Sequence, residues 1–310
     1  MQPDLSVRLG KLVLKNPVMV ASGTFGYAAE FRDFVDVRKL GAIVTKTITL
    51  KPRQGNPGPR TCETPSGMLN SIGLENPGLD AFIDEKLPPV AQLGVPVIVS
   101  IASEHDPEEF VTVARRLDKE KSVAALELNI SCPNVKHAAR GLRAGLIAQD
   151  PEATHAAVRA VRKATRKTLI TKLSPNVTDI CEIALAAQAA GSDALALINT
   201  LQGMSIDSAT RRPKIAMGVG GLSGPAVRPI AVRMVWEVYR KTRIPIIGMG
   251  GIMDTASALE FIIAGATAVS VGTANFVNPS VSNEIVAGLV SYLKRSRAVT
   301  IQSMIGSLEL

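Results

Sequence analysis

One unit repeats eight times along this chain of 310 residues. Each unit is a short apolar run that ends in polar residues or glycine and is followed by a segment that leads to the next run. The runs are continuous rather than alternating, which is typical of parallel strands buried on both faces. They lie at residues 16–23, 40–46, 93–101, 123–131, 167–175, 190–200, 243–251 and 264–273. Because amphipathic helical segments separate most of them, they predict an α/β fold, a closed (β/α)₈ barrel with right-handed crossovers.

The remaining residues predict a hairpin and three long insertions. Residues 5–16 alternate around Gly10 and indicate an N-terminal β-hairpin at the bottom of the barrel. Residues 50–80 and 200–225 follow strands 2 and 6, residues 138–149 follow strand 4, and all three are too long for plain turns. Active sites of such barrels lie at the C-terminal ends of the strands, where these loops emerge. We expect residues 1–310 to form a single domain.

The composition excludes several classes of protein. No apolar run approaches the ~18 residues that a membrane helix needs, and the N-terminus lacks the features of a signal peptide. Cys62, Cys132 and Cys181 are too few and too scattered to hold a zinc ion or an iron–sulfur cluster, and they suit a reducing compartment. We therefore expect a cytoplasmic protein with no metal and no membrane association. The formal charge of +8 is spread along the chain, and a solvated basic surface accounts for it without a nucleic-acid partner.

Glycines and lysines at the strand ends form the first part of a candidate site. Gly250 and Gly251 follow strand 7, Gly272 and Thr273 follow strand 8, and both pairs precede a helix. Bare backbone at these positions predicts a phosphate cradle. Lys46 and Lys172 end strands 2 and 5. A lysine there is costly unless it meets an anion or an electron-rich ring.

Carboxamides and one thiol form the second part. Asn70, Asn129, Asn134 and Asn199 occupy strand exits or inserted loops on the same face of the barrel. A carboxamide holds donors and acceptors in one plane, which suits a flat heterocycle with C=O and N–H groups. Cys132 lies between two of these asparagines. We expect Asn176, at a comparable exit, to be a turn residue.

Together these residues resemble the class 1 dihydroorotate dehydrogenases, the flavin enzymes of pyrimidine synthesis. The resemblance covers nearly the whole chain. It rests on ASGTFGYAAEF (21–31), the segment 45–78, ELNISCPNVKH (127–137), INT (198–200), GGLSGPAVRP (220–229), GMGGI (248–252) and VGTA (271–274). The motif GMLNSIGL after GNPGPR resembles subclass 1B, whose catalytic chain works with a separate electron-transfer subunit. Class 2 members have serine at the position of Cys132 and an N-terminal extension, and this chain has neither.

The resemblance implies that the chain oxidises (S)-dihydroorotate to orotate in the de novo synthesis of UMP. It assigns FMN to Ser22, Lys46, Thr47, Asn129, Lys172, Ile198, Gly224, Gly250, Gly251, Gly272 and Thr273. It assigns the substrate to Lys46, Asn70, Ser71, Ile72, Gly73, Leu74, Asn129, Asn199 and Thr200. Asn134, near Asn129 in the sequence, can help to hold the pyrimidine ring. It gives Cys132 the position of the catalytic base.

The chemistry agrees with these assignments. The oxidation removes a proton from C5 and a hydride from C6, so a flavin on one face of the substrate requires a base on the other. A thiol with a reference pKa of about 8.5 needs only modest help to act near neutral pH. Lys172 is expected to lie near the N1–O2 edge of the flavin, where its charge would stabilise the anionic reduced ring.

The route of the electrons points to a partner. The chain has no dinucleotide-binding fingerprint and no cluster ligands, so NAD⁺ is reached only through another protein. The likeness to subclass 1B implies FAD and a [2Fe–2S] cluster on that subunit, and a homodimer of this chain within a heterotetramer. Two features depart from the subclass. Residues 137–150 are longer and more basic than is typical, and Ser100 stands where relatives often have asparagine.

Several alternatives remain at this point. An FMN-dependent tRNA dihydrouridine synthase pairs a similar barrel with a cysteine, but only residues 274–310 follow strand 8, too few for an RNA-binding helical domain. A fumarate-using class 1A dihydroorotate dehydrogenase shares the same site. A lyase or isomerase of phosphorylated sugars would use the glycine cradle but leave Cys132 and the asparagines without a role. A flavin-binding protein without turnover is the fourth alternative.

Overall fold

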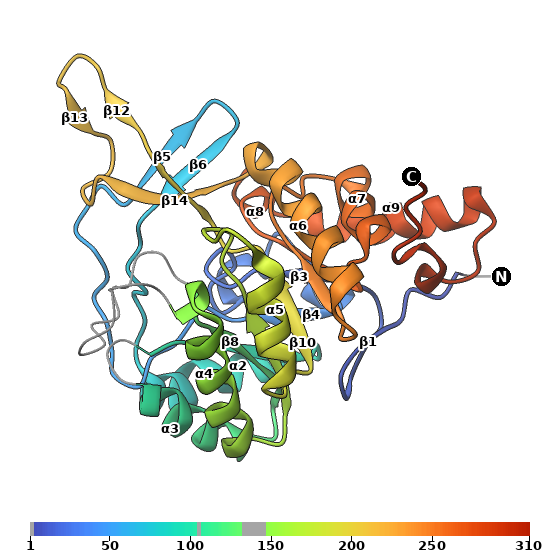
Figure 1. Cartoon of the computed structure of the whole chain (residues 1–310), viewed down its shortest axis with the longest axis horizontal. Coiled ribbons are helices and arrows are strands. Elements are labelled where there is room, and N and C mark those ends of the chain that lie inside the picture. Colours follow the sequence, from blue (N-terminus) through green and yellow to red (C-terminus); the bar gives the residue numbers. More distant parts are fainter. Residues whose placement is uncertain (1–2, 104–106, 132–146) are drawn as a thin grey trace.

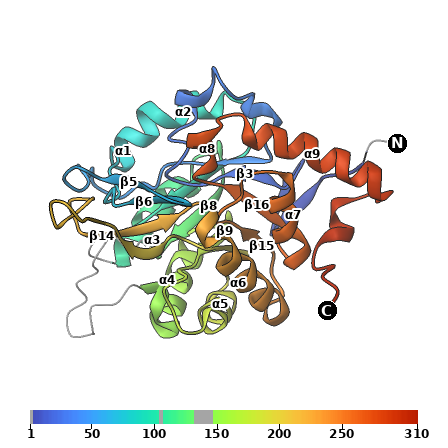
Figure 2. The same cartoon turned by 90° about the horizontal axis from the view of Figure 1, so that it is seen from above.

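The computed structural model describes residues 3–103, 107–131 and 147–310, and a closed barrel of eight parallel strands forms its centre (Figures 1 and 2). The strands follow one another around the barrel in sequence order. They are β3 (Val18–Val20), β4 (Ala42–Val44), β7 (Val97–Ile101), β8 (Val123–Asn129), β9 (Thr168–Lys172), β10 (Ala194–Leu197), β15 (Ile246–Gly248) and β16 (Ala268–Val271). The predicted barrel and its eight strands are confirmed.

Burial and register explain how the strands place the site. Every residue of β4, β7, β9, β10, β15 and β16 is buried, as the continuous apolar runs predict. In the parallel register, Leu126 pairs with Leu169 and Asn129 pairs with Lys172. Polar residues that end neighbouring strands therefore lie side by side at the same end of the barrel.

Helices cover the outside of the barrel. The longer ones are α3 (Pro107–Asp118), α4 (Pro151–Ala164), α5 (Ile180–Ala189), α6 (Arg228–Lys241), α7 (Thr255–Ala264) and α9 (Val281–Ser296). The Asp150 carboxylate accepts the backbone N–H groups of Glu152 and Ala153 and so caps α4. Gly265 ends α7 with a φ of +123°, a conformation that favours glycine.

The connection between β3 and β4 departs from the predicted repeat. Instead of a full helix it contains two short 3₁₀ turns, η1 (Ala29–Phe31) and η2 (Val37–Lys39). Gly26 adopts a φ of +51°, which a continuous right-handed helix excludes. The rings of Phe25 and Phe31 stack with their centroids 4.2 Å apart over a small separate core. Aromatic packing thus replaces the helix in this unit.

The two ends of the chain meet at one side of the barrel. The predicted hairpin forms from β1 (Val7–Leu9) and β2 (Leu12–Leu14). The carbonyl of Leu9 accepts the hydroxyl of Thr168, the first residue of β9, at 3.4 Å, which places the hairpin at the bottom of the barrel. Near the C-terminus, before η6 (Ile301–Met304), the Asp4 N–H donates to the Val299 carbonyl at 2.9 Å.

The insertions after β4 and β10 combine into a single antiparallel sheet. Its order is β11–β14–β6–β5, from β11 (Leu201–Met204), β14 (Val219–Ser223), β6 (Gly67–Asn70) and β5 (Thr61–Thr64). A hairpin of β12 (Ile206–Asp207) and β13 (Arg212–Pro213) extends from it. Both views show this sheet projecting on the side opposite the chain termini (Figures 1 and 2). The third predicted insertion is described only from residue 147, where η4 (Ile147–Gln149) precedes α4.

Short helical segments complete the structure. After the first insertion, α1 (Leu79–Ala81), a π-helical turn η3 (Phe82–Lys86) and α2 (Leu87–Ala91) lead to β7. The turn η5 (Pro225–Val227) precedes α6, and α8 (Ala274–Val277) follows β16. Across the described ranges, no helix is both long enough and apolar enough to span a membrane.

Candidate active site

A chain of hydrogen bonds joins polar residues at the C-terminal ends of β4, β7, β8 and β10. The Ser131 hydroxyl donates to Oδ1 of Asn129 at 3.2 Å and accepts Nδ2 of Asn199 at 2.9 Å. On the other side, Nδ2 of Asn129 donates to the Thr47 hydroxyl at 3.3 Å. The hydroxyls of Thr47 and Ser100 are 2.9 Å apart. This network fixes which edge of each carboxamide is used internally and which remains available for a ligand.

The serine at position 100 fits this network, because its hydroxyl reaches Thr47, which supports Asn129. Ser100, Asn129 and Ser131 are all buried. Buried polar groups need such partners because an unpaired one costs free energy.

Lys172 lies beside this network with its charge buried. Its Nζ donates to the Ser22 hydroxyl at 3.2 Å and lies 3.8 Å from Oε1 of Glu127. Both side chains of the ion pair are almost fully buried, at 6% and 2% exposure. The sequence predicts that Ser22 and Lys172 share a ligand, and the structure brings them together from β9 and the exit of β3.

Glycines from two separate loops approach one another. A Cβ on Gly251 would lie 2.7 Å from the carbonyl oxygen of Gly224, and one on Gly250 would lie 2.9 Å from Cβ of Ala231. Their φ angles are +74° and +129°, so no other residue fits there without strain. The backbone is therefore bare at the place where α6 and the loop after β15 meet, as a phosphate cradle requires.

The remaining residues of the predicted cradle lie nearby. The Thr273 hydroxyl donates to the Ser223 hydroxyl at 2.7 Å, which connects the end of β16 to the residue before Gly224. Gly272 faces Ala21 and Thr24, which belong to the same loop as Ser22. Ile198 packs against Gly250, since a Cβ there would lie 3.5 Å from its Cγ1. The region around the glycine cradle is thus surrounded by six of the predicted residues: 198, 224, 250, 251, 272 and 273.

A second group of loop residues holds residues 70–74 in place. Nδ2 of Asn70 donates to the Gly221 carbonyl at 3.2 Å, within the pairing of β6 and β14. Nδ2 of Asn56 donates to the Ser71 hydroxyl at 2.9 Å, and its N–H donates to the carbonyl of Ile72 at 2.9 Å.

Residues 73 and 74 are fixed in the same way. Nε of Arg53 donates to the Gly73 carbonyl at 3.2 Å. Nδ2 of Asn76 donates to the Leu74 carbonyl at 2.7 Å. The segment is therefore held through its backbone. Across the joint sheet, Gly221 also packs against Thr200, whose hydroxyl would lie 2.0 Å from a Cβ at that glycine.

Lys46 lines a cavity of about 480 Å³ beside this segment. Its backbone N–H donates to the Gly26 carbonyl at 2.9 Å. The other lining residues are Gly26, Tyr27, Glu30, Arg53, Gln54, Glu75, Asn76 and Pro77. Burial, helped by the charge of Glu30, raises the pKa of Tyr27 to about 12. The tyrosine therefore stays protonated at neutral pH and cannot serve as a base in this cavity.

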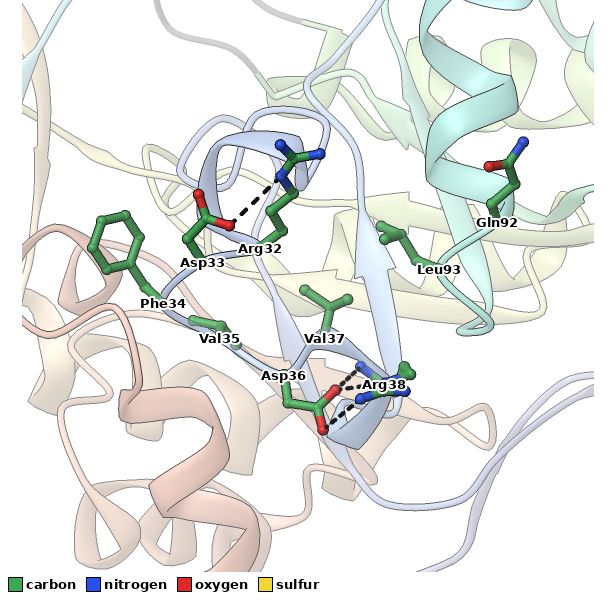
Figure 3. Close-up of a pocket in the computed structure, with 9 residues that line it drawn as sticks. All are labelled: Arg32, Asp33, Phe34, Val35, Asp36, Val37, Arg38, Gln92 and Leu93. Carbon is green, nitrogen blue, oxygen red and sulfur yellow. Dashed lines mark hydrogen bonds and ion pairs between the residues drawn. The ribbon is translucent and has the colours of Figure 1, made fainter.

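Another cavity of about 480 Å³ lies away from these residues (Figure 3). It is lined by Arg32, Asp33, Phe34, Val35, Asp36, Val37, Arg38, Gln92 and Leu93. None of these is a predicted site residue. Its charged residues pair locally, Arg38 with Asp36 at 2.9 Å and Arg32 with Asp33 at 3.7 Å. We assign no role in the reaction to this cavity.

The predicted and the observed site residues differ at five positions. Two predicted residues, Cys132 and Asn134, lie outside the described residues. Three residues of the site, Ser131, Glu127 and Asn176, were not predicted. Asn176 does form a turn, its N–H donating to the Ser174 hydroxyl at 3.1 Å. Its side chain also donates to the Thr200 carbonyl at 3.1 Å and accepts the N–H of Gln202 at 2.9 Å.

Known proteins resemble the chain over its full length. A family model described as dihydroorotate dehydrogenase matches residues 4–293. The dihydroorotate dehydrogenase B (NAD(+)) catalytic subunits of Trichlorobacter lovleyi and Pelobacter propionicus are 54% and 53% identical over 310 residues, which is 100% of each chain. A crystal structure of the dihydroorotate dehydrogenase of Eimeria tenella in complex with ferulenol superimposes with a TM-score of 0.81 at 25% identity, covering 98% of this chain and 88% of that one. This chain belongs to the dihydroorotate dehydrogenase family.

Proposed function

We propose that this chain is the catalytic subunit of an NAD-linked dihydroorotate dehydrogenase and oxidises (S)-dihydroorotate to orotate in pyrimidine biosynthesis. The observation that carries the proposal is the network through Ser131 at the barrel mouth, with Lys172 beside it. The full-length identity to NAD-linked relatives supports it. These observations favour it over a tRNA-modifying, a sugar-phosphate or a fumarate-using enzyme.

The members of this family use a flavin, and we propose that here it is FMN. The buried Lys172 and the bare backbone of Gly224, Gly250 and Gly251 fit such a cofactor, because they offer a cation and a phosphate cradle in one region. The further residues that would hold FMN are Ser22, Lys46, Thr47, Asn129, Ile198, Gly272 and Thr273. The chemistry that FMN supplies when bound is the acceptance of a hydride from C6 of the substrate.

The carboxamides would bind and orient the pyrimidine ring. Asn129 uses Oδ1 to accept from Ser131 and one N–H to reach Thr47, which leaves one N–H for a ligand. Asn199 uses one N–H on Ser131, while its Oδ1 accepts the N–H of Thr200 at 2.7 Å. Both amides therefore offer a donor, which suits the carbonyl oxygens of dihydroorotate. Lys46 would meet the carboxylate of the substrate.

The other substrate residues come from the loops. We propose that Asn70, Ser71, Ile72, Gly73 and Leu74 line the substrate side of the site, supported by the contacts that fix this segment. Asn134 and Thr200 would complete the set. Asn176 holds the carbonyl of Thr200 and so acts as a positioning residue.

We propose that Cys132 removes the proton from C5. Its place in the sequence, three residues after Asn129 at the exit of β8, supports this role. The other two cysteines are poorer candidates. Burial raises the pKa of Cys181 to about 11, so its thiol stays protonated at neutral pH, and Cys62 lies in β5 of the inserted sheet.

The relatives are named as catalytic subunits, which implies a partner subunit. We propose that this partner carries FAD and a [2Fe–2S] cluster and passes electrons to NAD⁺, and that a homodimer of this chain forms the centre of a heterotetramer. We propose a cytoplasmic location, supported by the unpaired Cys62 and Cys181. The closed barrel and the contact between Asp4 and Val299 support one domain over residues 1–310.

An anaerobic titration tests the proposal. Purified protein should contain about one non-covalent FMN per chain and be yellow. Addition of dihydroorotate should bleach the flavin absorbance, and an equal amount of orotate should form. A colourless protein that does not bind added FMN, or a flavoprotein that dihydroorotate leaves oxidised, would exclude the proposed function.

A further inference from the structure

One buried carboxylate has no part in the reaction described so far. Glu127 and Lys172 are the two charged residues that are buried within the described part of the chain. The Glu127 side chain is 2% exposed and lies in β8. Its neighbour Lys172 reaches from β9 to Ser22 at the exit of β3, on the opposite side of the closed barrel, so the pair lies inside the ring of strands. Burial of a charge is costly, and an ion pair in a core is often no more stabilising than apolar residues of the same volume. Its presence at this position therefore calls for a role beyond packing.

The contact between the two charges has an unusual geometry. Oε1 of Glu127 lies 3.8 Å from Nζ of Lys172, too far for a hydrogen bond. This oxygen has no hydrogen-bond partner among the residues that the structure describes. Nζ instead donates to the Ser22 hydroxyl at 3.2 Å. Glu127 therefore acts on Lys172 through its charge.

The strand register shows how the pair is oriented. Asn129 pairs with Lys172 across β8 and β9, whereas Glu127 pairs with Ile170. Glu127 and Asn129 are two residues apart and so project from the same face of β8. Because a strand rises about 3.3 Å per residue, Glu127 is about 7 Å deeper in the barrel. The ammonium group stands between the carboxylate and the mouth of the barrel, where the Asn129 network lies.

This arrangement alters the field that a bound flavin would meet. Alone, Lys172 would direct a full positive charge at the flavin and strongly favour its reduced, negatively charged form. A carboxylate behind the ammonium converts that charge into a dipole, whose field falls off faster with distance. The flavin would then be less strongly held in the reduced state.

We propose that Glu127 is a positioning residue that holds Lys172 and partly cancels its charge, and thereby limits how strongly the site stabilises reduced flavin. The role fits an enzyme that must pass its electrons onward, because an over-stabilised reduced flavin would retain them. Since it rests on the proposed function, its test must separate the two.

The test is the equilibrium between oxidised and reduced flavin, measured in the FMN-loaded protein against a reference dye. Glu127→Gln keeps the shape and removes the charge. We expect it to shift the two-electron equilibrium constant about tenfold toward reduced flavin, which corresponds to ~30 mV. Glu127→Asp retains the charge but withdraws it from Lys172, so its shift should have the same direction and be about two- to threefold. Ser270→Ala is the matched control, because this buried hydroxyl has no hydrogen-bond partner in the described structure.

The outcomes are distinct. A merely structural Glu127 would lower FMN content or thermal stability in both variants and leave the equilibrium constant within twofold of wild type, which would overturn the inference. If Glu127→Gln does not retain flavin, Glu127→Asp alone decides the test. An equilibrium constant within twofold of wild type in that variant would then overturn the inference. Wild-type protein that binds FMN and is reduced by dihydroorotate upholds the proposed function whatever the variants show. Wild-type protein that does neither refutes the function itself.

Discussion

At the scale of single residues, the sharpest prediction concerns Cys132. Cys132→Ser should still bind FMN and orotate but lose most of its turnover at pH 7, because a serine hydroxyl is far harder to deprotonate than a thiol. A positioned base contributes about 10²–10⁴-fold to the rate, so we expect a loss of this size. Activity should recover as the pH rises. Steady-state rates of orotate formation between pH 6 and 10 measure this.

The other two cysteines are the controls for this variant. Cys62→Ser and Cys181→Ser should retain near-normal rates, since Cys62 lies in the inserted sheet and Cys181 lies in the first turn of the outer helix α5. The raised pKa of Cys181 means that its thiol carries no charge to lose at neutral pH. Near-wild-type turnover of Cys132→Ser at pH 7 would show that the base lies elsewhere.

Ser131 carries the second residue-scale prediction. Ser131→Ala removes the hydroxyl that joins Asn129 to Asn199, so each amide keeps only its second hydrogen bond, to Thr47 or to the Thr200 N–H, and is held less firmly. A lost hydrogen bond of this kind costs about 1 kcal/mol, and we expect orotate to bind about five- to tenfold more weakly with FMN content unchanged. Isothermal titration with orotate measures the effect, and Ser270→Ala should leave it unaffected. Unchanged orotate affinity in Ser131→Ala would contradict the proposed role.

Sequence reasoning reached part of the site at this scale. Lys172 and Asn129 were recognisable because a polar residue at the end of an apolar strand stands out. Ser131 and Glu127 were not recognisable in this way. Ser131 resembles any polar residue at the exit of a strand, and nothing in the sequence distinguishes Glu127 from other acidic residues. Their roles depend on which side chains from β9 and β10 come within reach. Those contacts form only when the barrel closes, so the sequence around each residue carries no pattern that predicts them.

At the scale of elements, the cap of α7 yields a prediction about pH. The Asp254 carboxylate accepts the backbone N–H of Ser257 at 2.8 Å and forms a capping box with it. This bond, with the Ser257 hydroxyl, holds the pKa of Asp254 below its usual value. A lowered pKa in the folded state contributes stability that is present above about pH 4, the unfolded value, and is lost as the pH falls further.

Asp254→Ala should therefore lower the free energy of unfolding by about 1 kcal/mol at pH 7. The difference from wild type should shrink near pH 3 as the wild-type carboxylate becomes protonated. Asp254→Asn is the matched control, because it keeps a good cap without the charge and should stay close to wild type at pH 7. Urea denaturation at both pH values measures this. A difference that is the same at pH 3 and pH 7 would rule out the capping charge as its source.

The inserted sheet shows where prediction of elements fails. Residues 50–80 and 200–225 were predicted only as long loops. The structure pairs β6 with β14 and so joins two segments about 150 residues apart. Cys62 pairs with Leu69 and Leu201 pairs with Leu222 in this sheet. The Pro and Gly residues around these strands predict loops and so hide the strands in the sequence. Pairing between such distant segments depends on the barrel bringing their ends together.

At the scale of the whole molecule, the barrel was predictable because its physics is local. Each buried strand must be apolar along its whole length, and eight such runs leave few other closed topologies. The unit between β3 and β4 was the exception, since a core formed by Phe25 and Phe31 takes the place of its helix. The residues of the candidate site lie at the C-terminal end of this barrel, at the ends of its strands and in the loops that follow them.

The most direct measurement compares electron acceptors for the isolated chain. With dihydroorotate as donor, the FMN-loaded chain should form orotate rapidly when an artificial dye is the acceptor and should show no appreciable rate with NAD⁺, because the path to NAD⁺ requires a partner subunit. Orotate formation is followed in both assays under the same conditions. Absence of orotate with every acceptor would contradict the proposed enzyme, brisk NAD⁺ reduction by this chain alone would contradict the partner, and brisk fumarate reduction would place it in subclass 1A.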